Sequence, residues 1–152
     1  MTYARVDRLR QNLINADIVA IVGLAIHDSD HVRQAAAAHY VPPPQFIIAL
    51  LGGFIPLIIA LALARRGSLR ASSVVAVAGS TLVMCMLLFV HLVGVCHLWA
   101  PLNGLFGMWA LTYWQLNVDV TSWLAVVVLV ASSSWLTVVA AVTWRRLGLE
   151  GP

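Results

Sequence analysis

The chain contains 152 residues, of which 61% are hydrophobic and only 10% are charged, and its mean hydropathy is +0.91. A soluble globular domain is about 45–50% apolar and about 25% charged, so this composition excludes a water-soluble enzyme, a disordered protein and a nucleic-acid-binding protein. The net charge of +3 comes from nine arginines, with no lysine, against six acidic residues. Because arginines beside apolar runs orient a chain in a bilayer, we expect a single-domain integral membrane protein.

The first predicted helix covers about residues 6–37 and is the least apolar of the set. Its uninterrupted apolar run, Ile18–Ile26, would cover only about 14 Å at a rise of about 1.5 Å per residue. The distribution of arginine nevertheless favours a spanning helix. If the segment spans the membrane, eight arginines lie on the inner side and one, Arg33, lies outside. If it does not, the division is five to four, which the positive-inside rule disfavours.

Three further spans are predicted at about residues 45–65, 72–99 and 120–146. Each supplies the roughly 20 apolar residues that cross a bilayer, and arginine pairs follow the first and the last of them. The proline run at residues 42–44 is expected to end the first helix and to form a stiff connection to the second.

Residues 100–118 are apolar and rich in aromatic side chains, but proline, asparagine and glycine interrupt them. A fifth span here would send the last arginine pair outside, so an outer interfacial helix or re-entrant segment fits better. The predicted fold is an all-α, integral membrane four-helix bundle. Both termini are expected in the cytoplasm, and the membrane is expected to be a bacterial inner membrane.

Five histidines fall on the outer side in this topology: His27, His31, His39, His91 and His97. His27 and His31 are spaced i, i+4, which places them about 40° apart on one helix face, a spacing that offers two ligands to one metal. Asp28 and Asp30 flank them as candidate ligands or as acceptors that orient an imidazole. His91 is expected at a similar depth on the third helix, whereas His97 lies about 120° away from it around that helix.

Three kinds of site fit this pattern. The first is a transition-metal site for copper or zinc, held by His27, His31 and His91 with Asp28, Asp30 or His97, where Met84 or Cys96 would favour copper. The second is haem b between helices, with His27 and His91 as axial ligands. The third is a proton or quinol site, since ionisable groups inside a membrane are functional candidates.

A different class of function is an accessory subunit that packs against a larger membrane complex and performs no chemistry. Membrane lipid and other membrane protein subunits are the expected partners, and nucleic acid is not. The sequence offers no paired nucleophile and base that would indicate an enzyme. The Walker, GxSxG, HExxH and CxxC motifs are also absent from it.

Asp17 lies inside the predicted first span, where an unpaired carboxylate is costly. We expect it to form a structural ion pair with Arg65, Arg66 or Arg70, or a local cap. Gly52, Gly53, Gly79 and Gly94 are expected to mark close helix contacts.

The string His27-Asp28-Ser29-Asp30-His31-Val32-Arg33-Gln34, followed much later by a membrane histidine before an aromatic loop, resembles a group of small four-helix membrane proteins of high-GC Gram-positive bacteria. This group is functionally uncharacterised, and the resemblance covers less than a third of the chain. It implies four helices and a candidate His/Asp site, but no activity.

Overall fold

The computed structural model describes residues 2–39, 41–42, 44–88 and 119–149. These residues form four α-helices: α1 (Tyr3–Ala37), α2 (Pro44–Arg65), α3 (Leu69–Leu88) and α6 (Val120–Leu149). Each helix is long and apolar enough to cross a membrane, and the prediction of an all-helical protein with four such helices is confirmed. The predicted aromatic segment at residues 100–118 and the end of the third span lie outside the described residues.

The first helix begins slightly earlier than predicted and ends at the predicted residue. It begins at Tyr3, and its 35 residues correspond to about 52 Å of helix, which is longer than the roughly 30 Å hydrocarbon core of a bilayer. It ends at Ala37, before the prolines, and His39 then adopts a left-handed backbone conformation with φ of 51°. Pro44 is instead the first residue of α2, a position where its missing N–H is tolerated.

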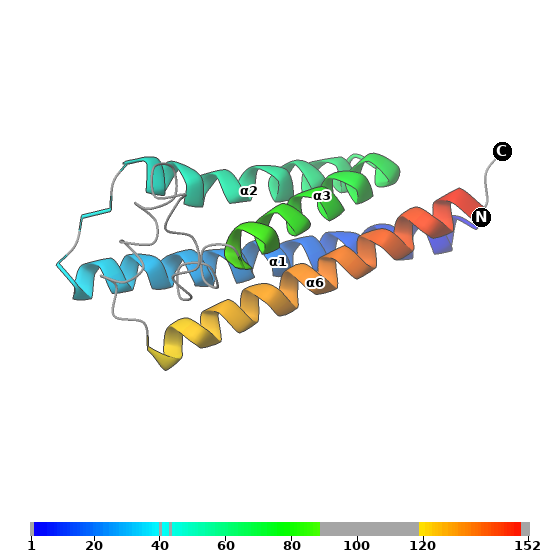
Figure 1. The fold of residues 1–152 in the computed structure, drawn as a ribbon. Coiled ribbons are helices and arrows are strands. Elements are labelled where there is room, and N and C mark those ends of the chain that lie inside the picture. Colours follow the sequence, from blue (N-terminus) through cyan, green and yellow to red (C-terminus); the bar gives the residue numbers. More distant parts are fainter. Residues whose placement is uncertain (1, 40, 43, 89–118, 150–152) are drawn as a thin grey trace.

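The four helices form an antiparallel bundle in which neighbours along the chain pack side by side (Figure 1). Helix α1 packs against α2 and α6, and α3 packs against the same two helices, whereas α1 and α3 touch only slightly. The start of α1 and the end of α6 lie at the same end of this bundle (Figure 1).

Contacts between the ends of the helices fix this arrangement. The Arg10 side chain at the start of α1 donates to the carbonyl oxygens of Ala64, at 3.1 Å, and Arg65 at the end of α2. The Arg70 side chain at the start of α3 likewise donates to the Leu147 carbonyl at the end of α6, at 2.8 Å. We call this end of the bundle the arginine end. It carries eight of the nine basic residues: Arg5, Arg8, Arg10, Arg65, Arg66, Arg70, Arg145 and Arg146.

The tight connection between α2 and α3 is built on Gly67, whose φ is +83°. The Ser68 amide donates to the Leu63 carbonyl at 2.9 Å, and the Gly67 amide donates to the Ala64 carbonyl at 3.0 Å. This pair of bonds is the Schellman arrangement that ends helices on a left-handed glycine. It turns the chain back at the arginine end.

The core is narrow because much of it is alanine and glycine. Gly79 of α3 lies directly against Pro56 of α2, Gly53 of α2 faces the Leu24 side chain, and Gly23 of α1 lies against Ser132 of α6. Gly53 and Gly79 were predicted to mark close contacts, and Gly23 was not. The same prediction was wrong for Gly52, where an added Cβ atom would meet nothing within 4 Å. Gly94 lies outside the described residues. The buried apolar core consists of Leu13, Ala16, Ala20, Leu24, Leu57, Ala60, Ala64, Leu69, Ala76, Val83, Leu87, Leu129, Leu136 and Ala140.

Large apolar side chains cover the outside of the bundle as well. On α2, Ile48, Leu51, Ile55 and Ile58 are all more than half exposed. A water-soluble protein keeps such exposed apolar patches small, so this surface suits contact with lipid hydrocarbon.

Candidate functional site

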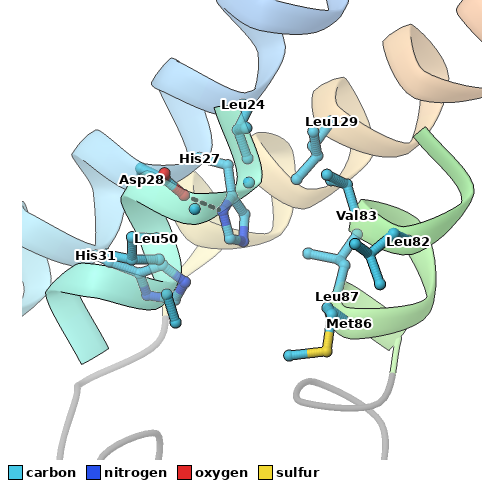
Figure 2. Close-up of a pocket in the computed structure, with 13 residues that line it drawn as sticks. Leu24, His27, Asp28, His31, Leu50, Leu82, Val83, Met86, Leu87 and Leu129 are labelled. Atoms are coloured by element: carbon cyan, nitrogen blue, oxygen red, sulfur yellow. Dashed lines mark hydrogen bonds and ion pairs between the residues drawn. The ribbon is translucent and has the colours of Figure 1, made fainter. Parts of the chain in front are cut away.

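A cavity of about 270 Å³ lies towards the end of the bundle opposite the arginine end, which we call the histidine end. Helices α1, α2 and α3 form most of its wall, and Leu129 of α6 completes it. The polar side chains in its described wall are His27, Asp28 and His31, all from α1 (Figure 2). The remaining wall is apolar or glycine: Leu24, Ala49, Leu50, Gly52, Gly53, Leu82, Val83, Met86, Leu87 and Leu129.

His27 and His31 share one face of α1, as their i, i+4 spacing predicts, and each is only 7% exposed. Their rings meet edge to face, with centroids 4.6 Å apart and an interplanar angle of 88°. Both side chains turn towards the cavity (Figure 2). Two imidazoles this close can reach one small ligand together.

Asp28 orients the His27 ring. Its Oδ1 lies 3.1 Å from Nδ1 of His27 (Figure 2), and a carboxylate acceptor at this position favours the tautomer with the proton on Nδ1. Nε2 is then the nitrogen that can serve as an acceptor or as a metal ligand. This is the carboxylate–histidine arrangement that accompanies many metal-bound imidazoles.

A methionine sulfur lines the cavity from α3, but it is not the one that the sequence favoured. Met86 lines the wall across from the two histidines (Figure 2). Met84, two residues earlier, points elsewhere, because the Ser134 hydroxyl of α6 lies 3.7 Å from its sulfur. Positions two apart on a helix differ by about 200°, so only one of these methionines can face the cavity.

Asp30 belongs to a second polar cluster beside the cavity. The Arg33 side chain donates to Asp30 Oδ1 at 2.8 Å and makes two bonds to Asp119, at 2.9 and 3.1 Å. The Gln34 amide group bridges Asp30 and the Ser122 hydroxyl. We call these five residues the α1–α6 clamp, because they join the end of α1 to the start of α6.

The clamp also explains the start of α6. The Asp119 side chain accepts the Ser122 amide at 3.1 Å, which is the N-cap interaction that satisfies a free amide of the first turn. The bonds from Arg33, together with this amide, hold the pKa of Asp119 below its usual value. Asp30 is therefore engaged by the clamp and does not join His27 and His31 in the wall of the cavity.

Several predicted ligands fall outside what the structure describes. His91, His97 and Cys96 all lie in the segment 89–118, so whether they approach His27 stays a prediction. His39 is exposed after the end of α1, and Cys85 is an exposed free cysteine. Within the described parts of the chain, no group of three or more His, Cys, Asp or Glu side chains could hold a metal ion.

Asp17 departs from its prediction. It is completely buried on the inner face of α1, and neither carboxylate oxygen has a hydrogen-bond partner. The expected ion pair with Arg65, Arg66 or Arg70 was wrong, as was the alternative of a local cap. Arg70 binds the Leu147 carbonyl at the end of α6 instead.

Comparison of the chain with protein-family models, with curated proteins and with solved structures finds no match. The geometry of the chain itself therefore carries the functional argument.

Proposed function

We propose that this chain is a multi-pass membrane protein that binds a transition-metal ion in the cavity at its histidine end. His27 and His31 would supply two imidazole ligands, and Asp28 would orient His27. The observation that carries the proposal is the pair of buried rings, 4.6 Å apart and facing one cavity, with a carboxylate on Nδ1 of one of them. Imidazole is a common ligand of copper, zinc, iron and nickel.

The size of the cavity favours a metal ion over haem b. Pockets for drug-sized ligands have volumes of about 300–1,000 Å³, and a haem is at least as large as such ligands. The described cavity of about 270 Å³ lies at the lower end of that range. A metal ion with two imidazoles and one or two further ligands needs much less room.

The methionine in the wall favours copper over zinc. Thioether sulfur is a soft ligand that selects copper, above all Cu(I). Met86 lines the cavity opposite the histidines (Figure 2), so its flexible thioether is our candidate third ligand for an ion held by His27 and His31. In this proposal the ion links α1 to α3, and the protein handles copper or transfers electrons through it.

The distribution of arginine supports an orientation for the protein. Cytoplasmic loops of membrane proteins are enriched in basic residues, and eight of nine arginines lie at the arginine end. We therefore place both termini in the cytoplasm and the histidine cavity near the outer face of a bacterial inner membrane. The aromatic segment at residues 100–118 would lie at the outer interface. Single-cysteine labelling at His39, which is exposed just after the end of α1, in a background lacking both native cysteines, should then occur from outside.

Metal analysis of the full chain purified in detergent tests the proposal. Supplied with Cu(I) under reducing conditions, the protein should bind one copper per chain. His27→Ala and His31→Ala should each abolish stoichiometric binding, and His39→Ala, which changes an exposed histidine outside the cavity, should not. Asp28→Asn should weaken binding about 10–100-fold, as loss of an orienting partner typically does. Met86→Leu should weaken Cu(I) more than Zn(II).

Other outcomes of the same purification would replace this proposal. A Soret band would indicate haem. Absence of both metal and haem, together with co-purification of larger membrane subunits, would indicate a non-catalytic accessory subunit. Copper binding that survives the loss of both His27 and His31 would contradict the assigned ligands.

A further inference from the structure

We propose that Asp17, together with Ser73, forms a proton-binding site in the core of the bundle, separate from the histidine cavity. Asp17 is 0% exposed, and both of its carboxylate oxygens lack a hydrogen-bond partner. Ser73 of α3 is also 0% exposed, and its hydroxyl oxygen lacks a partner as well. Buried polar groups are almost always hydrogen-bonded, so two such side chains in one small core are unusual.

The register of the helices places these two side chains at similar heights. Arg10 of α1 meets Ala64 of α2, and Leu24 of α1 meets Gly53, so Asp17, midway between them, is level with α2 near residue 59. The Ser72 hydroxyl donates to the Ala60 carbonyl at 2.7 Å, which brings the adjacent Ser73 to this level within about one helical turn.

No cation neutralises the Asp17 carboxyl group in the described parts of the chain. The charged groups nearest in register on the four packed helices are Arg10, Arg65, Arg70 and Arg145, at the arginine end. The Arg10 and Arg70 side chains bind helix-end carbonyls, and none of the four hydrogen-bonds to Asp17. An isolated ionised carboxylate is strongly unfavourable in such a place. The neutral acid is the form that these surroundings accommodate.

A proton fits this site better than a metal cation does. Hard cations such as Ca²⁺ take about six to eight oxygen ligands. The core near Asp17 is instead lined by alanine and leucine, and the Ala60 carbonyl already accepts the Ser72 hydroxyl. A proton needs only the carboxylate itself. The Ser73 hydroxyl lies at the same level and is not hydrogen-bonded to Asp17 or to any other group, and we assign it as the group that pairs with the resulting acid.

Buried hydroxyl groups also lie on the side of this level that faces the arginine end. Ser72 and Ser73 on α3 and Thr143 on α6 are all buried in the inner surface of the bundle between Asp17 and that end. The exchange step is the breaking of the carboxyl O–H bond, with transfer of the proton to water at the arginine end and retention of the electron pair by the Asp17 carboxylate. Protonation reverses it.

Infrared spectroscopy of the full chain in phosphatidylcholine vesicles, without added metal, tests this proposal. At neutral pH the wild type should show the carbonyl band of a protonated carboxylic acid, and this band should shift in D₂O. Asp17→Asn should remove the band completely, whereas Asp7→Asn, which changes an exposed carboxylate of the same helix, should leave it. Ser73→Ala should move the band to higher frequency, because the acid loses a hydrogen-bond partner.

A second variant protects the test against loss of folding. Asp17→Glu keeps a carboxyl group, so it should shift the band and not remove it. Absence of any band that depends on residue 17 would overturn the proposal, because Asp17 would then be ionised. A band that does not shift in D₂O would also overturn it, since the proton would not exchange. Loss of the band on addition of Na⁺ at constant pH would identify a metal cation as the occupant instead.

Discussion

The close approach of α2 and α3 at Gly79 predicts that a larger residue there destabilises the bundle. A Cβ atom added at Gly79 would lie 2.7 Å from Cβ and 3.1 Å from Cγ of Pro56. The Pro56 ring cannot rotate away, so α2 and α3 must separate, and overpacking of this kind costs about 1–3 kcal/mol. Alanine in place of glycine regains about 1 kcal/mol of helix propensity, so Gly79→Ala should change the free energy of unfolding by between about 0 and −2 kcal/mol.

Gly52→Ala is the matched control for this prediction. A Cβ atom at Gly52 would meet nothing within 4 Å, so this variant should keep the propensity gain of up to about 1 kcal/mol. The two variants should therefore differ by about 1–3 kcal/mol. Thermal unfolding in one detergent, followed by circular dichroism, measures this difference as about 2–4 °C in Tm for each kcal/mol. Equal melting temperatures for Gly79→Ala and Gly52→Ala would refute the reasoning.

Two further predictions concern the contacts of α6. Gly23→Ala places a Cβ atom against the Ser132 hydroxyl, so it should lower Tm, and the double variant with Ser132→Ala should recover part of the loss; purely additive effects on Tm would contradict this. The pKa of Asp119 is lowered by Arg33 and the Ser122 amide, so ionised Asp119 in the clamp stabilises the folded protein. This stabilisation should be complete above the pKa of an unfolded aspartate, about 3.9. It should be lost as the pH falls through the lower pKa that Asp119 has in the folded protein. Asp119→Asn should remove this part of the acid dependence of Tm, Asp7→Asn should not, and identical acid profiles for all three proteins would argue against the ion pair.

Counting arginines predicted more of the fold than hydropathy did. The apolar run of α1 is short, but only a spanning first helix gathers eight arginines on one side, and the structure has α1 in the bundle with those eight at one end. The inward face of α1 could also be predicted from the sequence. The i, i+4 spacing of His27 and His31 places both on one side of the helix, and both rings are buried in the structure.

The lack of an ion pair at Asp17 could not be predicted from charge alone. Asp17 and the arginines of the α2–α3 turn are close along the bundle, and an ion pair was the simplest expectation. The carbonyl groups at helix C-termini compete for the same guanidinium groups, because they lack partners within their own helix and carry the negative end of its dipole. Arg10 and Arg70 bind such carbonyls, and that competition depends on tertiary contacts that a single sequence does not encode locally.

The choice between Met84 and Met86 has a similar origin. Both lie in the same apolar stretch of α3, and sequence spacing does not fix the rotation of α3 about its own axis. The Ser80–Thr137 contact at 2.7 Å and the Met84–Ser134 contact hold α3 against α6. This rotation leaves Met86 to face the cavity. The methionine sulfur that faces the cavity could therefore be identified only from the α3–α6 interface.

The polar residues of α1 explain which of its faces the other helices cover. On one face, α1 buries Asp17, His27, Asp30, His31 and Gln34, a set that would be costly against lipid. Its opposite side carries exposed apolar residues such as Ile18, Val22 and Ile26. Helices α2 and α6 cover the polar face, and the α1–α6 clamp secures it at the histidine end. The bundle thus makes a poorly apolar helix compatible with the membrane, and in doing so it encloses both the histidine cavity and the Asp17 site.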